Sequence, residues 1–154
     1  MAVFFTASQD AQAITTAADL LFCTVAADKP VTLWGLDIGN TTDLGDANEE
    51  VLRIGIYTGV TGGGAGSALT EVCMWDVPGT TAGAAWVGTG TASTGGTLRK
   101  TIYWNVRQAG PAWVAIHELA TVRCNAANDP IAFRLLAAPA DSITLSYEVI
   151  WSEV

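Results

Sequence analysis

The stretch Val31–Gly59, VTLWGLDIGNTTDLGDANEEVLRIGIYTG, sets the fold class of this chain. Its last part alternates regularly, with Leu52, Ile54 and Ile56 on one side and Arg53 among the residues on the other. A period of two indicates a β-strand that lays one face on a core. The first eight residues of the stretch are mostly β-branched or large and apolar, which predicts another strand. We therefore expect two strands joined by an acidic connection.

Similar strand patterns recur over the whole chain, separated by Gly, Pro, Asp and Ser. Turn residues at Ala26–Pro30 and Ala138–Asp141 predict two β-hairpins, Asp19–Ile38 and Ile131–Trp151. No long amphipathic helix is predicted, although residues 7–16 and 117–128 are compatible with a helical turn. The expected strands are Val3–Thr6, Asp19–Val25, Val31–Ile38, Val51–Thr58, Leu69–Trp75, Trp86–Thr91, Leu98–Val106, Trp113–Ile116, Ile131–Leu136 and Ile143–Trp151.

The pattern predicts one all-β domain over residues 1–154: a two-sheet antiparallel sandwich of jelly-roll type with eight to ten strands. An up-and-down barrel is the alternative. We expect Trp34, Trp104 and Trp151 in the core, because each lies inside a strand pattern. The long final strand should pack on the core.

Composition excludes several classes of protein. Half of the residues are hydrophobic, 14% are charged and the formal net charge is −8, a balance opposite to that of a disordered chain. The negative charge disfavours binding to nucleic acid or to an anionic membrane. No apolar run approaches the ~20 residues of a membrane span, and the first residues lack a basic leader, so we expect no signal peptide. Low charge with high apolar content predicts a homo-oligomer.

The sequence contains no recognised catalytic motif. The one histidine, His117, lies beside Glu118 and is expected to be structural. GxSxG and HExxH motifs are absent. The glycine-rich segment 58–67 is not followed by GK[S/T] or by a helical pattern, so it is expected to be a plain loop. We expect no enzyme activity and no cofactor.

The acidic connection is a candidate site with three open interpretations. Asp43, Asp46, Glu49 and Glu50 lie close together in it. In the first interpretation they form a solvated loop or pair with Arg53, Arg99 or Arg134. In the second they make a charged contact with a partner chain. In the third interpretation Asp43, Asp46 and Glu49 bind Ca²⁺, for which carboxylate oxygens are suitable ligands. The spacing does not match that of an EF-hand loop.

Tryptophans near turns are the other candidates for a partner interface. Trp75, Trp86 and Trp113 are expected to be exposed there, since an exposed aromatic residue anchors protein contacts or stacks on a sugar. Cys23 is expected to be a buried thiol inside a strand. The spacing leaves a bond between Cys73 and Cys124 open.

Segments near both ends of the chain resemble a known group of proteins. These are the strand that begins Asp19-Leu, the turn Ala-Asp-Lys-Pro30, Thr42-Asp-Leu-Gly-Asp-Ala-Asn-Glu-Glu-Val-Leu-Arg53, and Arg134-Leu-Leu-Ala-Ala-Pro-Ala-Asp141 with the final strand. The sequence resembles small jelly-roll decoration, or cement, proteins of tailed-bacteriophage capsids. The segment 67–92 departs from the pattern.

The resemblance implies a structural virion protein. Such a protein is assembled in the host cytoplasm, binds the major capsid protein on the outer capsid surface as a homotrimer, and has no catalytic residues. The alternative is a carbohydrate- or receptor-binding β-sandwich module of a phage tail or fibre, which would use Trp75, Trp86 or Trp113.

Overall fold

The computed structural model describes residues 2–41, 50–75, 80, 82–108, 110–124 and 129–153. These residues form β-strands and one short 3₁₀ helix, η1 (Glu118–Ala120), and none of their helices is long and apolar enough to cross a membrane. The strands are β1 (Val3–Ile14), β2 (Ala18–Thr24), β3 (Val31–Asn40), β4 (Val51–Thr61), β5 (Val72–Cys73), β6 (Ala85–Val87), β7 (Gly90–Thr91), β8 (Thr94–Asn105), β9 (Gly110–Val114), β10 (Val122–Cys124), β11 (Ile131–Leu135) and β12 (Ile143–Glu153).

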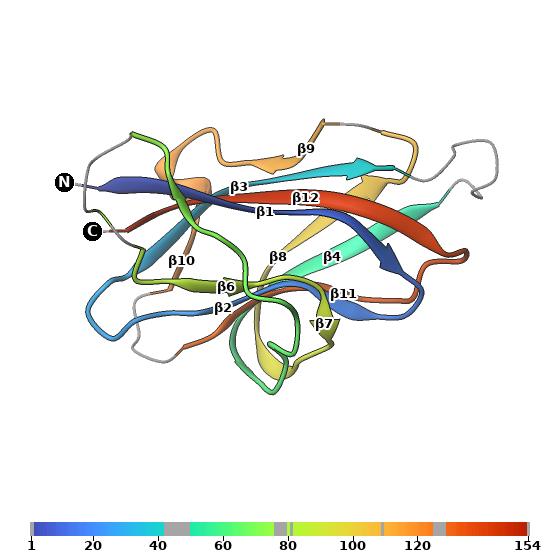
Figure 1. Cartoon of the computed structure of the whole chain (residues 1–154), viewed down its shortest axis with the longest axis horizontal. Helices are drawn as coiled ribbons and strands as arrows, with labels where there is room; N and C mark the ends of the chain where they lie inside the picture. The colour runs from blue at the N-terminus through green and yellow to red at the C-terminus, as the bar shows by residue number, and fades with distance from the viewer. Residues whose placement is uncertain are drawn as a thin grey trace.

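The strands form two antiparallel sheets that pack face to face (Figure 1). Sheet A has the order β10-β3-β12-β1-β5, with β9 also paired to β3; sheet B has the order β6-β2-β11-β4-β8, with β7 also paired to β2. If β9 and β10 count as one interrupted strand, the eight main strands are ordered 6-3-8-1 in one sheet and 2-7-4-5 in the other. This interleaved order is that of a jelly roll. The predicted sandwich is confirmed.

The core lies between the sheets and comes from the alternating positions that the sequence indicates. In β4 the side chains of Leu52, Ile54 and Ile56 are buried, as predicted. β12 alternates in the same way at the centre of sheet A and packs on the core. Trp104 and Trp151 are buried, whereas Trp34 is only partly buried, on the outer face of sheet A.

The two predicted hairpins are wrong. β2 lies in sheet B and β3 in sheet A, and β11 and β12 are likewise divided between the sheets. The turns at Ala26–Pro30 and Ala138–Asp141 do reverse the chain, but each connection crosses the ~10 Å between stacked sheets. Turn residues indicate a reversal and do not reveal which sheet the next strand joins.

Three local features differ from the sequence-based expectation. The described residues contain twelve strands instead of eight to ten, and the excess consists of short edge strands such as β5 and β7. Only Val72–Cys73 of the predicted strand Leu69–Trp75 is a strand. In the strand predicted over Leu98–Val106, Leu98 shares the spacing of the buried Ile102 and Trp104 but is exposed, because a register shift beside Tyr57 places Leu98 opposite that residue.

Candidate functional site

A row of mostly apolar or small residues crosses the outer face of sheet A and is exposed at both ends. Strand register places Val114 beside Gly35, Gly35 beside Ile150, Ile150 beside Thr6, and Thr6 beside Val72. The row therefore crosses every strand from β9 to β5. Val72 and Val114 at its two ends are more than half exposed.

An aromatic row runs beside the aliphatic one. The ring centroid of Phe4 on β1 lies 5.6 Å from that of Trp34 on β3 and 5.5 Å from that of Trp75 after β5. The Trp34 indole N–H donates to Ser152 Oγ at 2.8 Å, which fixes the ring over β12. We call the two rows together the apolar band: Phe4, Trp34, Val72, Trp75, Val114 and Ile150.

A protruding loop extends this apolar surface beyond the edge of the sheet. It follows β9, whose end is held by a bond from the Ala115 N–H to the Trp34 carbonyl at 2.7 Å. Ile116 and Leu119 in this loop are 94% and 89% exposed. Two neighbouring aliphatic side chains this exposed gain almost no burial from their own chain and would be buried only by contact with another molecule. We call Ile116 and Leu119 the loop tip.

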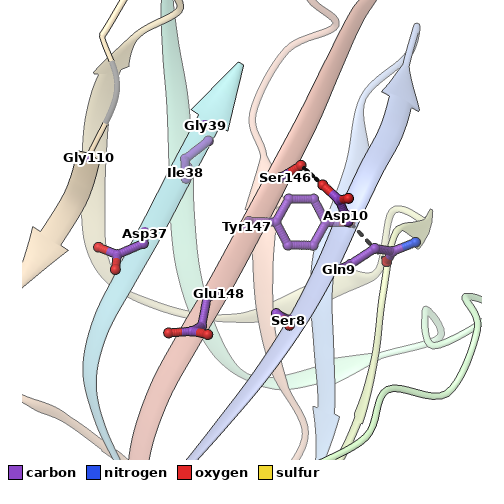
Figure 2. A pocket seen from close by; sticks show the side chains of 10 residues that line it. All are labelled: Ser8, Gln9, Asp10, Asp37, Ile38, Gly39, Gly110, Ser146, Tyr147 and Glu148. Carbon is purple, nitrogen blue, oxygen red and sulfur yellow. Dashed lines mark hydrogen bonds between the residues drawn. The ribbon is translucent and has the colours of Figure 1, made fainter. Parts of the chain in front are cut away.

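The other end of the same sheet face is acidic. A groove of about 460 Å³ lies over β1, β3 and β12 (Figure 2). Its lining consists of Ser8, Gln9, Asp10, Asp37, Ile38, Gly39, Gly110, Ser146, Tyr147 and Glu148, with no lysine or arginine. We call it the acidic groove. Cross-strand pairing sets Glu148 directly between Ser8 and Asp37, while Ser146 Oγ donates to the Asp10 carboxylate.

The acidic groove disfavours the charged form of the Glu148 carboxylate. Partial burial raises the pKa of Glu148, and the nearby charge of Asp37 raises it further. Neither of these two groups makes an ion pair with any basic residue that the structure describes. Burial also raises the pKa of Tyr147, although hydrogen bonds from Thr89 oppose the rise. The groove is therefore a negative, solvent-facing depression without an internal counter-charge.

The outer face of sheet B is covered by the chain itself. Phe22, Val60 and Ala132 form a small buried cluster there. The loop after β4 lies over this cluster: a Cβ atom placed on Gly64 would lie 3.0 Å from the Phe22 ring. The glycine-rich segment, expected to be a plain loop, therefore serves as a lid on sheet B.

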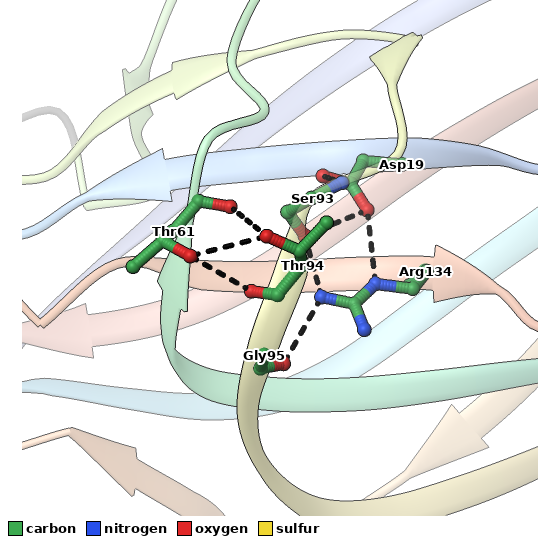
Figure 3. A network of polar contacts seen from close by, with 6 residues as sticks. All are labelled: Asp19, Thr61, Ser93, Thr94, Gly95 and Arg134. Atoms are coloured by element: carbon green, nitrogen blue, oxygen red, sulfur yellow. Dashed lines mark hydrogen bonds and ion pairs between the residues drawn. The ribbon is translucent and has the colours of Figure 1, made fainter.

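A buried ion pair holds the start of β8 beside that loop (Figure 3). The Asp19 carboxylate accepts the Ser93 N–H at 2.8 Å and the Ser93 hydroxyl at 3.1 Å, and lies 3.7 Å from Arg134 Nε. Arg134 also donates to the Gly95 carbonyl and lies over the Tyr57 ring, 4.1 Å from its centroid. Burial raises the Asp19 pKa despite these partners. The network is structural.

Most of the acidic connection lies outside the described residues, including Asp43, Asp46 and Glu49, so the Ca²⁺ and partner-contact predictions there remain predictions. Glu50 is described: its carboxylate accepts the Ala140 N–H at 3.0 and 3.1 Å. Within the described ranges, no three His, Cys, Asp or Glu side chains are placed to hold a metal ion.

The tryptophan prediction holds for one residue of three. Trp75 is 53% exposed, whereas Trp86 and Trp113 are 1% and 8% exposed. Trp86 packs between the sheets against Phe133 and Trp151, and Lys100 Nζ lies 5.6 Å from the Trp113 ring centroid. Assignment of Trp86 and Trp113 to an exposed interface was wrong, because nearby turns do not prevent a short strand from facing the core.

The remaining reactive side chains have structural environments. His117 caps η1, since its Nδ1 accepts the Leu119 N–H at 3.2 Å. Cys23, Cys73 and Cys124 are all free thiols, so no Cys73–Cys124 bond is present. Cys23 is buried, as predicted, and burial raises its pKa well above the usual value.

Sequence reasoning missed the apolar band and the acidic groove. Glu148 lies on the polar side of the alternating pattern of the last strand, but nothing in the sequence pairs it with Asp37. The available signal was weak: β1 and β3 carry large apolar residues on both faces, as Phe4 and Trp34 show. A strand that is apolar on both sides is either sandwiched or contacts a partner.

Comparison with known proteins found no matching family model, no matching curated protein and no matching solved structure.

Proposed function

We propose that this chain is a structural virion protein, a decoration protein that binds the outer surface of a tailed-phage capsid as a homotrimer and stabilises the shell. The observation that supports it is the uncovered apolar band on sheet A. The partial sequence resemblance to capsid decoration proteins supplies the identity of the partner, the major capsid protein.

The apolar band has the properties of a protein contact surface. It presents two aromatic anchors among aliphatic side chains, Trp34 on β3 and Trp75 just after β5. Contiguous exposed apolar patches mark docking surfaces in soluble proteins. The band lies on paired strands, so little order is lost when a partner covers it.

Decoration also explains the physical role of such a surface. A protein that binds only the assembled shell shifts the equilibrium away from the open or dissociated state by mass action. No chemistry is required of the decoration protein, in keeping with our proposal that it is not an enzyme. Its negative charge would suit an outward position that does not compete for the packaged genome.

The proposal is tested by adding the purified chain to expanded, decoration-free heads of its phage and quantifying the sedimented protein. We expect saturable, stoichiometric binding and heads that resist heat better than bare ones. Val72→Thr with Val114→Thr should lower binding at least tenfold, since both ends of the apolar band then become polar. Absence of wild-type binding to heads would refute the proposal.

The loop tip is our candidate for the contact between sister subunits. Ile116 and Leu119 are too exposed to contribute to the fold of one chain. Light scattering should give a trimer for the wild type and a monomer for Ile116→Ser with Leu119→Ser, with an unchanged circular dichroism spectrum. A trimer that survives both substitutions would place the contact elsewhere.

A carbohydrate-binding tail module is the rival function. It relies on exposed tryptophans, and only Trp75 of the three candidates is exposed. Sugar sites usually combine an aromatic platform with polar side chains at its rim, whereas the Trp75 ring packs against the apolar ring of Phe4. Binding to a glycan array that is lost in Trp75→Ala would favour this function instead.

A further inference from the structure

We infer that the outer face of sheet A binds an extended, basic polypeptide segment of its partner, whose apolar side chains cover the apolar band while lysine or arginine side chains enter the acidic groove. The identity of that partner as the capsid protein rests on the proposed function. The chemistry of the segment rests on the sheet face itself.

The first reason is charge. Asp37 and Glu148 sit directly opposite each other on neighbouring strands, an arrangement that is unfavourable for like charges. Among the residues that the structure describes, no lysine or arginine lines the acidic groove to relieve this repulsion. A positive group from a partner would neutralise this pair and is the complementary occupant.

The second reason is the distribution of charge between the two sheets. The only basic residue in the strands of sheet A is Arg123, which pairs with Glu118 at 3.6 Å away from the groove. The strands of sheet B, in contrast, carry Arg53, Arg99, Lys100 and Arg134. Sheet A is therefore selectively acidic on the face that also has the apolar band.

The third reason is spacing. Glu148 and Ile150 stand two residues apart on the same face of β12, roughly 7 Å along the strand. Alternate side chains of an extended partner segment have the same separation. If one residue of the partner segment packs on Ile150, the residue two positions further along that segment lies beside Glu148. The geometry selects a segment of the form apolar-x-Lys/Arg.

A metal ion is the less suitable occupant. Ca²⁺ needs six to eight oxygen ligands that converge on one point, and the carboxylates of the groove do not form such a set. The groove carboxylates lie on three neighbouring strands, β1, β12 and β3, around an open depression (Figure 2). Long, flexible basic side chains adapt to that shape.

The test uses a synthetic peptide, acetyl-Val-Thr-Val-Thr-Arg-Thr-Arg-amide, titrated into the ¹⁵N-labelled full chain and followed by amide chemical shifts. We expect shifts concentrated in β1, β3 and β12, and loss of binding in high salt. Asp37→Asn with Glu148→Gln should weaken binding five- to tenfold. The control, Asp28→Asn with Glu118→Gln, removes the same charge elsewhere and should bind as the wild type does.

Equal weakening by the groove variant and the control, or equal binding of a peptide with Glu in place of Arg, would overturn the inference. The same variants on expanded heads separate the two proposals. Heads that bind the groove variant as tightly as the wild type contradict the inference and leave the decoration function standing. Heads that bind no wild-type protein refute that function, and the peptide titration then decides the inference alone.

Discussion

The outer faces of sheets A and B both carry apolar and charged side chains, but the chain covers these side chains on sheet B and not on sheet A. On sheet B the apolar side chains Phe22 and Val60 are buried under the loop after β4. On sheet A the apolar band has no such cover: Phe4 is only partly buried and Val72 is more than half exposed. The carboxylates of the two sheets differ as well. Asp19 on sheet B pairs with the opposite charge of Arg134, whereas Glu148 on sheet A lies opposite the like charge of Asp37.

This difference separates residues that stabilise the monomer from residues that are available to a partner. A loop laid over a sheet contributes stability within one chain. An uncovered apolar face contributes nothing until a second molecule covers it. The following predictions test whether substitutions on the two faces divide in this way.

The largest effect is expected for Asp19→Ala on sheet B. The substitution removes the acceptor of two Ser93 hydrogen bonds and leaves the mostly buried Arg134 guanidinium without its carboxylate. We expect a loss of about 3 kcal/mol in the free energy of unfolding, measured by urea denaturation. Asp10→Ala on sheet A, which removes an exposed carboxylate, should cost less than about 0.5 kcal/mol. Similar costs for the two variants would remove the distinction between the faces.

The loop lid gives the next largest effect. Gly63 has φ +82°, and an added Cβ would lie 2.7 Å from Asp19 Oδ2 and 2.9 Å from Ser93 Cβ. Gly63→Ala should therefore cost about 2–3 kcal/mol from strain and overlap combined. The matched control is Gly62→Ala, where φ is +67° but nothing lies within 4 Å, so only about 1 kcal/mol of backbone strain is expected. Thermal unfolding measures both; equal losses would show that the loop does not pack on sheet B.

Valine-to-threonine substitutions compare the two faces most directly, because shape and β-branching are kept. Val60→Thr places a hydroxyl in the buried cluster of sheet B and should cost about 1.5 kcal/mol. Val72→Thr on the apolar band should change stability by less than about 0.5 kcal/mol, since the side chain is already half exposed. Differential scanning calorimetry provides the comparison. A large loss at Val72 would mean that the band supports the monomer.

The smallest effect is expected at Glu148, and it depends on pH. Its pKa is raised above the ordinary 4.5 in the folded state, so the folded protein favours the protonated form. Stability contributed by this group is therefore greatest at low pH and falls as the pH rises from 4.5 through the folded-state pKa. Glu148→Gln should raise the Tm at pH 7, and the gain should disappear below pH 4.5. A gain that persists at pH 3.5 would have another origin.

The sequence predicts the class of fold well because its strongest signal is local. Alternation in β4 and β12 fixes which side chains enter the core, and Leu52 and Val149 are buried accordingly. Strand pairing is not local. The residues Ala26–Pro30 would be equally suitable for a hairpin or a crossing between sheets, so the hairpin prediction failed for a reason that no turn residue reveals.

The candidate site could be predicted only in part. Trp75 is exposed as expected. Trp86 is buried because β6 pairs with β2 at the edge of sheet B and turns this side chain toward the core. The acidic groove depends on the pairing of β12 with β3, which brings residues 37 and 148 together from distant parts of the chain. Patterns within one strand carry no information about such neighbours.

The interleaved strand order also governs how this chain folds. β1 pairs along most of its length with β12, from which it is separated by most of the sequence, so sheet A stays incomplete until β12 has been synthesised. Pairings that span the sequence are slow to form, typically milliseconds to seconds in all-β domains. During that interval nascent strands with two apolar faces are vulnerable to mispairing. Yield of correctly folded protein should therefore rise when synthesis is slowed by low temperature.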